Sequence, residues 1–592
     1  MADNTEKKPF GKIRSMLFPI YGYECKKLIP LTLIFLAVSM TYSMLRGLKD
    51  VYVINYMGPD SIYCLKVVVI PSIVIFTILY TSIAKRVDGY TRFNVVFTYF
   101  LAFLLMFSFI LLPYCDALKL NGLADMLNDK FPKMKGWWEA IRVWPVSLLY
   151  IHAEAFGTMA LGVAFWTFAN SIFSSVQAKR MYSFLSTGAA LGAILSGIVT
   201  YKFTKHTDLL FFTSVGCLVF ILVVYNYLIK RIKADPVGYE IEEKPKKTKT
   251  KVKLTFAQSI QCLLKSKYLS FVAFIVLGYN MFIALLESIW KGKVGAYGKE
   301  VVQNFLNEQS ALLNIDLSDK ASSPELLLQA KEVGKEATAA IYAYQSICTG
   351  ILSLFLIFFV ASSMSKKSWK VRALFTPIAS LVSTVIFYIF FKKMNLLSPF
   401  ADKFGSSLML TFVLFGLGIL VFIKSSKYIF FDTSKEQAYI PLDENEKVNG
   451  KAAIDAIGSR LGKGLSSVMI SLVLGPLFGG LQGITGITFI LIFFVIAMWL
   501  LSVIGLSPLY EQKILERERE KAEENKNKGK EEEDIKNNEE HKKEASSEKV
   551  VEKVKRTSNS EDKEVTSEKN EDVTTEKVKG VTSKKTNTEE DK

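Results

Sequence analysis

The feature that most constrains this chain is a series of long apolar runs along its first 507 residues. A helix needs roughly 20 apolar residues to cross the ~30 Å hydrocarbon core of a bilayer. About twelve segments reach this length, and no soluble domain requires so many. They are 28–46, 62–84, 93–115, 145–170, 181–203, 208–230, 268–291, 337–362, 371–391, 403–424, 451–478 and 483–507. The sequence therefore predicts an all-α polytopic membrane protein with about 12 transmembrane helices.

A basic segment, 231–267, divides these spans six and six, with "EEKPKKTKTKVK" at its centre. We expect two six-helix bundles, 28–230 and 268–507, in a major-facilitator-like arrangement. No convincing internal repeat is visible, so this expectation rests on the number of spans. Residues 1–27 are then a cytoplasmic N-terminal segment and 231–267 a cytoplasmic linker.

The C-terminal stretch 508–592 differs sharply, because it is rich in Lys and Glu and has no aromatic residue after Tyr510. Such a composition buries too little apolar surface to offset the entropy of ordering, so we expect a disordered cytoplasmic tail. Its first part, "YEQKILERERE", is compatible with an extension of the last helix.

Lys and Arg residues gather on alternate short loops, which places both termini in the cytoplasm and the mixed-charge loop 292–336 outside. The same bias accounts for much of the net charge of +17 and suits contact with a lipid surface, so we expect no nucleic-acid partner. The N-terminus has no apolar core typical of a secretory signal. We therefore expect a multi-pass protein of the plasma (inner) membrane of an intracellular bacterium, and a monomer.

Metal and cofactor chemistry finds no support in the residue pattern. The six cysteines are scattered without a CxxC pair, and the whole chain has three histidines. The segment "GSRLGKG" has one residue too few between its glycines for a P-loop, and Gly464 replaces the hydroxyl residue. We expect no metal, no cofactor and no ATP hydrolysis.

Ionisable residues inside apolar spans are costly and call for a reason. Glu154 lies well inside the fourth span, too deep for its short side chain to reach water. It is either paired with another helix or held protonated as a purely structural residue, or it faces a cavity as a functional carboxylate. We favour the interpretation that Glu154 is a functional carboxylate facing a cavity.

Other charges lie nearer the span ends and admit stronger structural explanations. Glu287 has Lys291 four residues on, so an ordinary helical ion pair is an alternative to a functional role. Lys66 is one turn into the second span, where a lysine can snorkel to the interface. Snorkelling also explains Lys49 and Arg46, which lie near the outer end of the first span.

A charged, glycine-rich strip, "AYIPLDENEKVNGKAAIDAIGSRLGKG", leads into the eleventh span. Lys451, Asp455, Arg460 and Lys463 follow one another there at near-helical spacing. A local Lys–Asp pair at a frayed helix start is one interpretation. The other is a phosphate site, because a helix N-terminus offers unpaired N–H groups and a positive dipole end.

Several of these stretches resemble the nucleotide transporters, or ATP/ADP translocases, of plastids and obligate intracellular bacteria and parasites. The most specific is "FFDTSKEQAYIPLDENEKVNGKAAIDAIGSRLGK", residues 430–463. It is similar to the family's "FD…KE.AYIPLD…K.KGKAAID….LGK" pattern. Supporting stretches are "LRGLKDVYV", "CLKVVVIPS", "AFWTFAN", "AKRMYSFLSTGA" and "LLESIWKGK". The resemblance covers nearly the whole membrane region and leaves out the tail.

This resemblance implies twelve helices and nucleotide transport without chemistry on the substrate. It also implies four substrate-binding residues, which are Lys66, Glu154, Glu287 and Lys451. The sequence departs from the family at two neighbouring positions. Phe156 replaces the tryptophan of "AELWG", and Ala284 replaces the asparagine of "NLVE".

We therefore expect a transporter that exchanges ATP for ADP by alternating access, with Lys66 and Lys451 engaging phosphates. Glu154 and Glu287 would pair with those lysines in the unloaded carrier. Two alternatives within the family are proton-coupled uptake and exchange of a broader set of ribonucleotides, with or without phosphate. Outside it, a membrane protein that binds nucleotides without transporting them predicts binding and no uptake.

Overall fold

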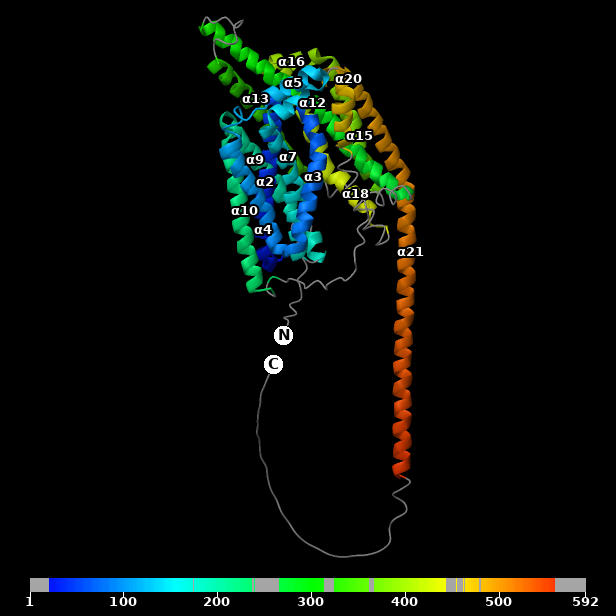
Figure 1. Ribbon diagram of the computed structural model, residues 1–592. Coiled ribbons are helices and arrows are strands. Elements are labelled where there is room, and N and C mark those ends of the chain that lie inside the picture. Colours follow the sequence, from blue (N-terminus) through cyan, green and yellow to red (C-terminus); the bar gives the residue numbers. More distant parts are fainter. Residues whose placement is uncertain are drawn as a thin grey trace, which may run out of the picture. The chain divides into compact units, whose positions relative to one another are not determined.

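The computed structural model describes ten stretches of the chain: 21–173, 175–236, 239, 266–313, 324–360, 367–442, 454, 462, 464–478 and 481–558. The chain divides into two compact units, Met1–Ile514 and Leu515–Lys592. Within the described residues the regular structure is helical, without strands (Figure 1). The predicted all-α class is confirmed.

The first half of the chain forms a run of helices and short helical turns. They are η1 (Gly22–Glu24), α2 (Cys25–Tyr56), α3 (Ser61–Arg86), α4 (Gly89–Met106), η2 (Phe107–Leu111), α5 (Asn121–Lys130), η3 (Pro132–Met134), α6 (Lys135–Arg142), α7 (Trp144–Phe156), η4 (Gly157–Phe165), α8 (Trp166–Ile172), α9 (Ser175–Lys202), η5 (Thr204–His206) and α10 (Leu209–Ala234). Within this half α2 contacts α7, α9 and α10, and α3 contacts α7.

The second half follows the basic linker. Its elements are α12 (Lys267–Leu313), α13 (Pro324–Phe355), η6 (Leu356–Val360), α15 (Trp369–Lys392), η7 (Met394–Leu397), α16 (Ser398–Phe404), α17 (Leu408–Ser426), η8 (Lys427–Phe431), α18 (Asp432–Ala438), η9 (Met469–Leu474), α20 (Gly475–Phe478) and α21 (Leu481–Ser558). Here α12 contacts α13 and α17, and α17 also contacts α13 and α15.

Eleven helices of the described residues are long and apolar enough to cross a membrane. They match eleven of the twelve predicted spans. The remaining one, 451–478, is described at 454, at 462 and from 464 on, where it forms a shorter apolar helix, Gly464–Phe478. The chain is thus a multi-pass membrane protein.

Several helices continue beyond the predicted apolar runs. The predicted external loop 292–336 is largely helical, because α12 ends only at Leu313 and α13 already begins at Pro324. With 47 residues, α12 extends for about 70 Å, more than twice the ~30 Å hydrocarbon thickness. α21 likewise runs to Ser558, well past the extension suggested by "YEQKILERERE". Strong helix formers such as Ala, Glu, Lys and Leu dominate these polar extensions, so helix formation does not require an apolar environment.

The two halves meet where α9 packs on α13 and where α2 packs on α12 and α13. A Cβ at Gly197 would lie 2.5 Å from Ile347 Cγ1, and one at Gly350 would lie 2.5 Å from Ile194 Cγ1. The two glycines therefore permit a close approach of α9 and α13, in the manner of small-residue interfaces of membrane helices.

Candidate substrate site

A group of buried charges lies at the contact between α2 and the second half. Lys49 and Asp50 have side chains that are 3% and 2% exposed. The Lys49 ammonium is 3.0 Å from Asp50 Oδ1, and the Lys291 ammonium is 2.6 Å from Asp50 Oδ2. Because Lys291 belongs to α12, this buried carboxylate joins cations from both halves of the chain.

A second carboxylate, Glu287 of α12, has an equivalent arrangement. Its Oε1 atom lies 3.1 Å from Arg46 Nη2 of α2 and 2.6 Å from Lys424 Nζ of α17. The alternative of a local Glu287–Lys291 pair is therefore not what the structure shows, since Lys291 binds Asp50 instead. The charge group thus connects α2, α12 and α17.

Glu154 and Lys66, both predicted site residues, lie at the first-half side of this group. Glu154 of α7 is 34% exposed, and its Oε1 is 3.1 Å from the Lys49 ammonium. Lys66 of α3 sits over the Tyr63 ring at 5.5 Å from the centroid. Among the described residues Glu154 thus pairs with Lys49, the residue that precedes Asp50, whereas Lys451, one of the two lysines expected to pair with the site carboxylates, lies outside them. α7, which carries Glu154, packs on both α2 and α3, the helices of Lys49 and Lys66.

Lys66 nevertheless belongs to the same electrostatic environment. The charged groups that act on it include Lys291, Glu287, Lys49 and Asp50. Among the described residues it forms no ion pair, and its contact with Tyr63 is a cation–π contact. The structure therefore places Lys66, Glu154 and Glu287 near one group of charges.

The register of α12 against α17 is set by a fully buried tryptophan. Trp290 Nε1–H donates to the Val413 carbonyl at 3.0 Å. A Cβ at Gly416 would lie 2.7 Å from Trp290 Cδ1, so only glycine leaves room for the ring. This contact lies three residues from Glu287 and two turns from Lys424, and it holds their helices at the spacing of the ion pair.

Other predicted residues do not join the charge group or lie outside the described part. Phe156 is fully buried and packs edge-on against Phe100, with ring centroids 5.1 Å apart. Ala284 is buried on α12, one turn before Glu287. Four predicted residues of the charged strip lie outside the described residues: Lys451, Asp455, Arg460 and Lys463.

Sequence reasoning missed two members of the group and undervalued two others. Asp50 and Lys424 were overlooked, Lys291 was considered only as a local partner of Glu287, and Arg46 was interpreted as a charge that can snorkel to the interface. Each lies within one turn of an end of a predicted span, where charges ordinarily reach the interface. The available signal was that Lys49 and Asp50 are adjacent charges of opposite sign, about 100° apart on a helix, at the end of an apolar run.

Two further features contrast with this group. Arg142, at the end of α6 outside the spans, contacts Asp125 at 2.5 Å and Glu139 at 3.2 Å, and the hydrogen bond to Asp125 raises the pKa of its guanidinium above the ordinary value.

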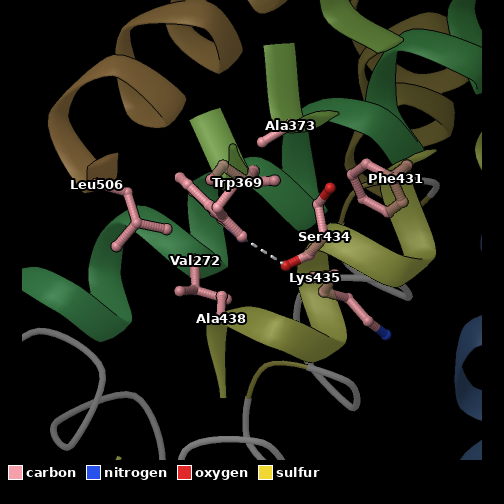
Figure 2. Close-up of a pocket in the computed structure, with 9 residues that line it drawn as sticks. Val272, Trp369, Ala373, Phe431, Ser434, Lys435, Ala438 and Leu506 are labelled. Carbon is pink, nitrogen blue, oxygen red and sulfur yellow. Dashed lines mark hydrogen bonds between the residues drawn. The ribbon is translucent and has the colours of Figure 1, made fainter. Parts of the chain in front are cut away.

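Figure 2 shows a small recess between α12, α15, α18 and α21, where Trp369 Nε1–H donates to the Ser434 carbonyl at 3.0 Å. Its lining is apolar apart from Ser434 and Lys435, which suits helix packing better than a charged ligand.

Comparison with known proteins identifies the family of this chain. The model of the TLC ATP/ADP transporter family matches residues 3–311 and 335–510. The chain belongs to this family. The ADP,ATP carrier protein 1 of Chlamydia pneumoniae is 30% identical over 541 residues, which cover 88% of this chain and 98% of that protein. The ADP,ATP carrier protein 1 of Rickettsia prowazekii is 29% identical, covering 86% and 98%.

One solved structure, a bacterial homologue of the iron transporter ferroportin in the inward-facing state, is 12% identical, with a TM-score of 0.41. It covers 82% of this chain and 98% of that chain. For this member of the TLC family, the matched residues include every charge of the group described above, from Arg46 to Lys424.

Proposed function

We propose that this chain exchanges ATP for ADP across a membrane by alternating access, leaving the substrate chemically unchanged. The observation that carries the proposal is the buried charge group shared between the two halves. A ligand that binds there contacts both halves at once, so its binding changes the free energy of moving one half relative to the other. Polyphosphate is the part of a nucleotide that such a group of cations attracts.

Four residues are proposed to serve the substrate, in agreement with the family resemblance. Lys66 and Lys451 bind phosphates as point charges, Lys451 with the help of backbone N–H groups at a helix N-terminus. Glu154 and Glu287 hold cations of the site in the unloaded carrier and release them when phosphate arrives. The ion pairs of Glu154 with Lys49 and of Glu287 with Lys424 support this exchange of partners.

Obligate exchange follows from the cost of moving unpaired charge through a region shielded from water. Isolated charges are strongly disfavoured in a low-dielectric environment. If the carrier can change the side to which its site opens only when a nucleotide neutralises its cations, it must bind a second nucleotide to change back. The direction of net flux is then set by the gradients of the two nucleotides.

The test is uptake of α-labelled ATP into proteoliposomes that contain the purified full-length protein. Vesicles preloaded with ADP are compared with vesicles that hold buffer alone. We expect rapid uptake only with internal ADP, and recovery of intact ATP from the vesicles. Uptake into unloaded vesicles that follows an imposed proton gradient would instead establish symport. Binding without uptake for a full panel of ribonucleotides would contradict transport.

The placement in the membrane is a separate part of the proposal. The distribution of Lys and Arg supports cytoplasmic termini, and relatives from Chlamydia and Rickettsia support a plasma membrane of an intracellular bacterium. We propose that a monomer is the transporting unit. Protease access to a C-terminal tag in intact and opened cells, with cross-linking of the purified protein, tests both points.

A further inference from the structure

Two buried carboxylates of the charge group are held in the same way, by one cation from each half. Asp50 lies between Lys49 of α2 and Lys291 of α12, at 3.0 and 2.6 Å. Glu287 lies between two further cations, one on α2 and one on α17. Two positions therefore exist at which an oxygen anion bridges the halves.

The two cations that hold Glu287 differ in their exposure to solvent. Arg46 is 41% exposed, whereas Lys424 is 10% exposed, and both contact the same Glu287 oxygen, Oε1. The Arg46 side thus reaches the surface of the group, and Lys424 forms its inner wall. An incoming anion can meet Arg46 first and then replace Glu287 at Lys424.

The charges of the group do not balance. Among the described residues it contains five cations and three carboxylates, a surplus of two positive charges. The cations are Arg46, Lys49, Lys66, Lys291 and Lys424, and the carboxylates are Asp50, Glu154 and Glu287. Arg46 and Lys66 are partly exposed, whereas Lys49, Lys291 and Lys424 are buried, and buried positive charge attracts an anion that compensates it.

Three buried tyrosines supply independent support for an anionic ligand. Tyr63, Tyr150 and Tyr342 are at most 5% exposed. Within the described residues their hydroxyl groups form no hydrogen bond of ordinary geometry, although Ser288 lies near the Tyr63 hydroxyl and Lys49 near the Tyr150 hydroxyl. All three lie near enough to Asp50 to interact with its charge. Buried hydroxyl groups are normally hydrogen-bonded, and phosphate oxygens would accept from them.

We propose that the cation pairs Lys49–Lys291 and Arg46–Lys424 are two phosphate-binding positions for a nucleoside di- or triphosphate. This inference rests on the proposed function and deepens it, because it assigns the polyphosphate chain to residues outside the four expected ones. Asp50 and Glu287 occupy the positions of phosphate oxygens in the unloaded carrier. A diphosphate fills both positions, while a monophosphate fills only one, so the arrangement selects for at least two phosphates.

Lys424 offers the sharpest test, since neither the sequence motifs nor the family resemblance assigns it a role. Binding of labelled ADP to the purified full-length protein in nanodiscs is measured with inorganic pyrophosphate, orthophosphate and AMP as competitors. We expect pyrophosphate to compete much better than orthophosphate for the wild type. Lys424→Gln should weaken the binding of ADP and of pyrophosphate by about 10- to 100-fold, the loss of affinity expected for one charge-assisted hydrogen bond.

Lys427 on the following turn provides a matched control. It pairs with Asp432 at 2.6 Å, outside the charge group. Lys427→Gln should leave ADP and pyrophosphate binding within about twofold of wild type, as expected for a charge without a role in phosphate binding. Lys424→Arg, which keeps the charge, should bind better than Lys424→Gln.

Lys424→Gln leaves Glu287 with fewer partners and could fail to fold for that reason. The double variant Glu287→Gln/Lys424→Gln removes both charges, and it should fold and still lack competition by pyrophosphate. Wild-type affinity for pyrophosphate in either folded variant would overturn the proposal, as would ADP binding that pyrophosphate cannot displace in the wild type. If Lys424-dependent binding is found without exchange in vesicles, the phosphate positions stand and the proposed transport fails.

Discussion

Two groups of ion pairs in this protein have similar distances and very different surroundings. Arg142 meets Asp125 at 2.5 Å outside the spans, where the two side chains are 21% and 61% exposed. Lys291 meets Asp50 at 2.6 Å where the two are 6% and 2% exposed. Distance alone therefore says little about what an ion pair does.

The surroundings decide the consequence of breaking each pair. Water and salt replace a lost partner at the surface, so exposed pairs contribute little. A buried charge has no such replacement, and the removal of one partner leaves an uncompensated charge. The buried pairs also join different halves of the chain, whereas Arg142 and Asp125 both belong to one short segment, 121–142. Function that depends on movement between the halves should therefore be sensitive to the buried pairs alone.

The largest effect is expected for Asp50→Asn. This change leaves Lys49 and Lys291 without their shared carboxylate, and breaking a buried pair costs about 3–5 kcal/mol. We expect a lower melting temperature in detergent and no exchange of ATP for ADP in proteoliposomes. The double variant Asp50→Asn/Lys291→Gln should recover much of the thermal stability without recovering exchange. If Asp50→Asn alone has the same melting temperature as the wild type, this buried pair does not stabilise the fold.

A smaller effect is expected when the geometry of the buried group is disturbed and its charges are kept. Gly416→Ala places a methyl group against Trp290, and overpacking of this kind costs about 1–3 kcal/mol. We expect a moderate loss of thermal stability and slower exchange, because α12 and α17 carry Glu287 and Lys424. Gly418→Ala on the same helix is the control, since nothing lies within 4 Å of the added atom. Equal behaviour of the two alanine variants would contradict the role of Trp290.

Hydropathy predicted most of the membrane helices but not their ends. In lipid every backbone polar group must be satisfied within the segment, so a long apolar run leaves the helix as its main solution. Beyond the bilayer that constraint is absent, and hydropathy carries no signal for the polar continuation of α12 to Leu313. The start of α13 at Pro324 was missed for the same reason.

The site was predictable where a charge lies deep in an apolar run, and less so elsewhere. Glu154 stood out by its depth and Glu287, nearer a span end, stood out less, but the partners that both bind are set by tertiary packing. Asp50 and Lys424 fall near the ends of predicted spans, where an interfacial charge is the common case. Only the packing of α2 on α7 and the second half shows that they are buried.

The close contact of α9 with α13 also had a readable signal. Ala190, Ile194 and Gly197 recur with the same spacing as Ala343, Ile347 and Gly350. A Cβ at Gly197 would lie 2.7 Å from the Ala343 carbonyl, and one at Gly350 would lie 2.8 Å from the Ala190 carbonyl. The short repeat is therefore reciprocal in space. It is too short to stand out in a search for whole-bundle repeats.

Glu154→Gln tests the half-exposed edge of the buried group and should lie between the two extremes. Glu154 is 34% exposed, so water partly compensates the loss of its pair with Lys49. We expect a stability loss of at most about 1 kcal/mol, as for other solvent-accessible pairs. Exchange should nevertheless fall by about tenfold, because Lys49 loses a charged hydrogen bond that positions it. Uptake and melting temperature are measured on the same preparation, and a parallel loss in both would contradict a role in the substrate cycle.

The smallest effect is expected for Asp125→Asn at the exposed pair. Arg142 keeps Glu139 as a partner at 3.2 Å, and the remaining change is screened by solvent. We expect a change in stability of about 0.2–1 kcal/mol that shrinks further as salt rises, and no change in exchange. Melting curves at low and high salt, with uptake assays at both, check this expectation. If Asp125→Asn stops exchange at unchanged stability, the segment 121–142 takes part in the substrate cycle, and burial is not what separates the two groups of ion pairs.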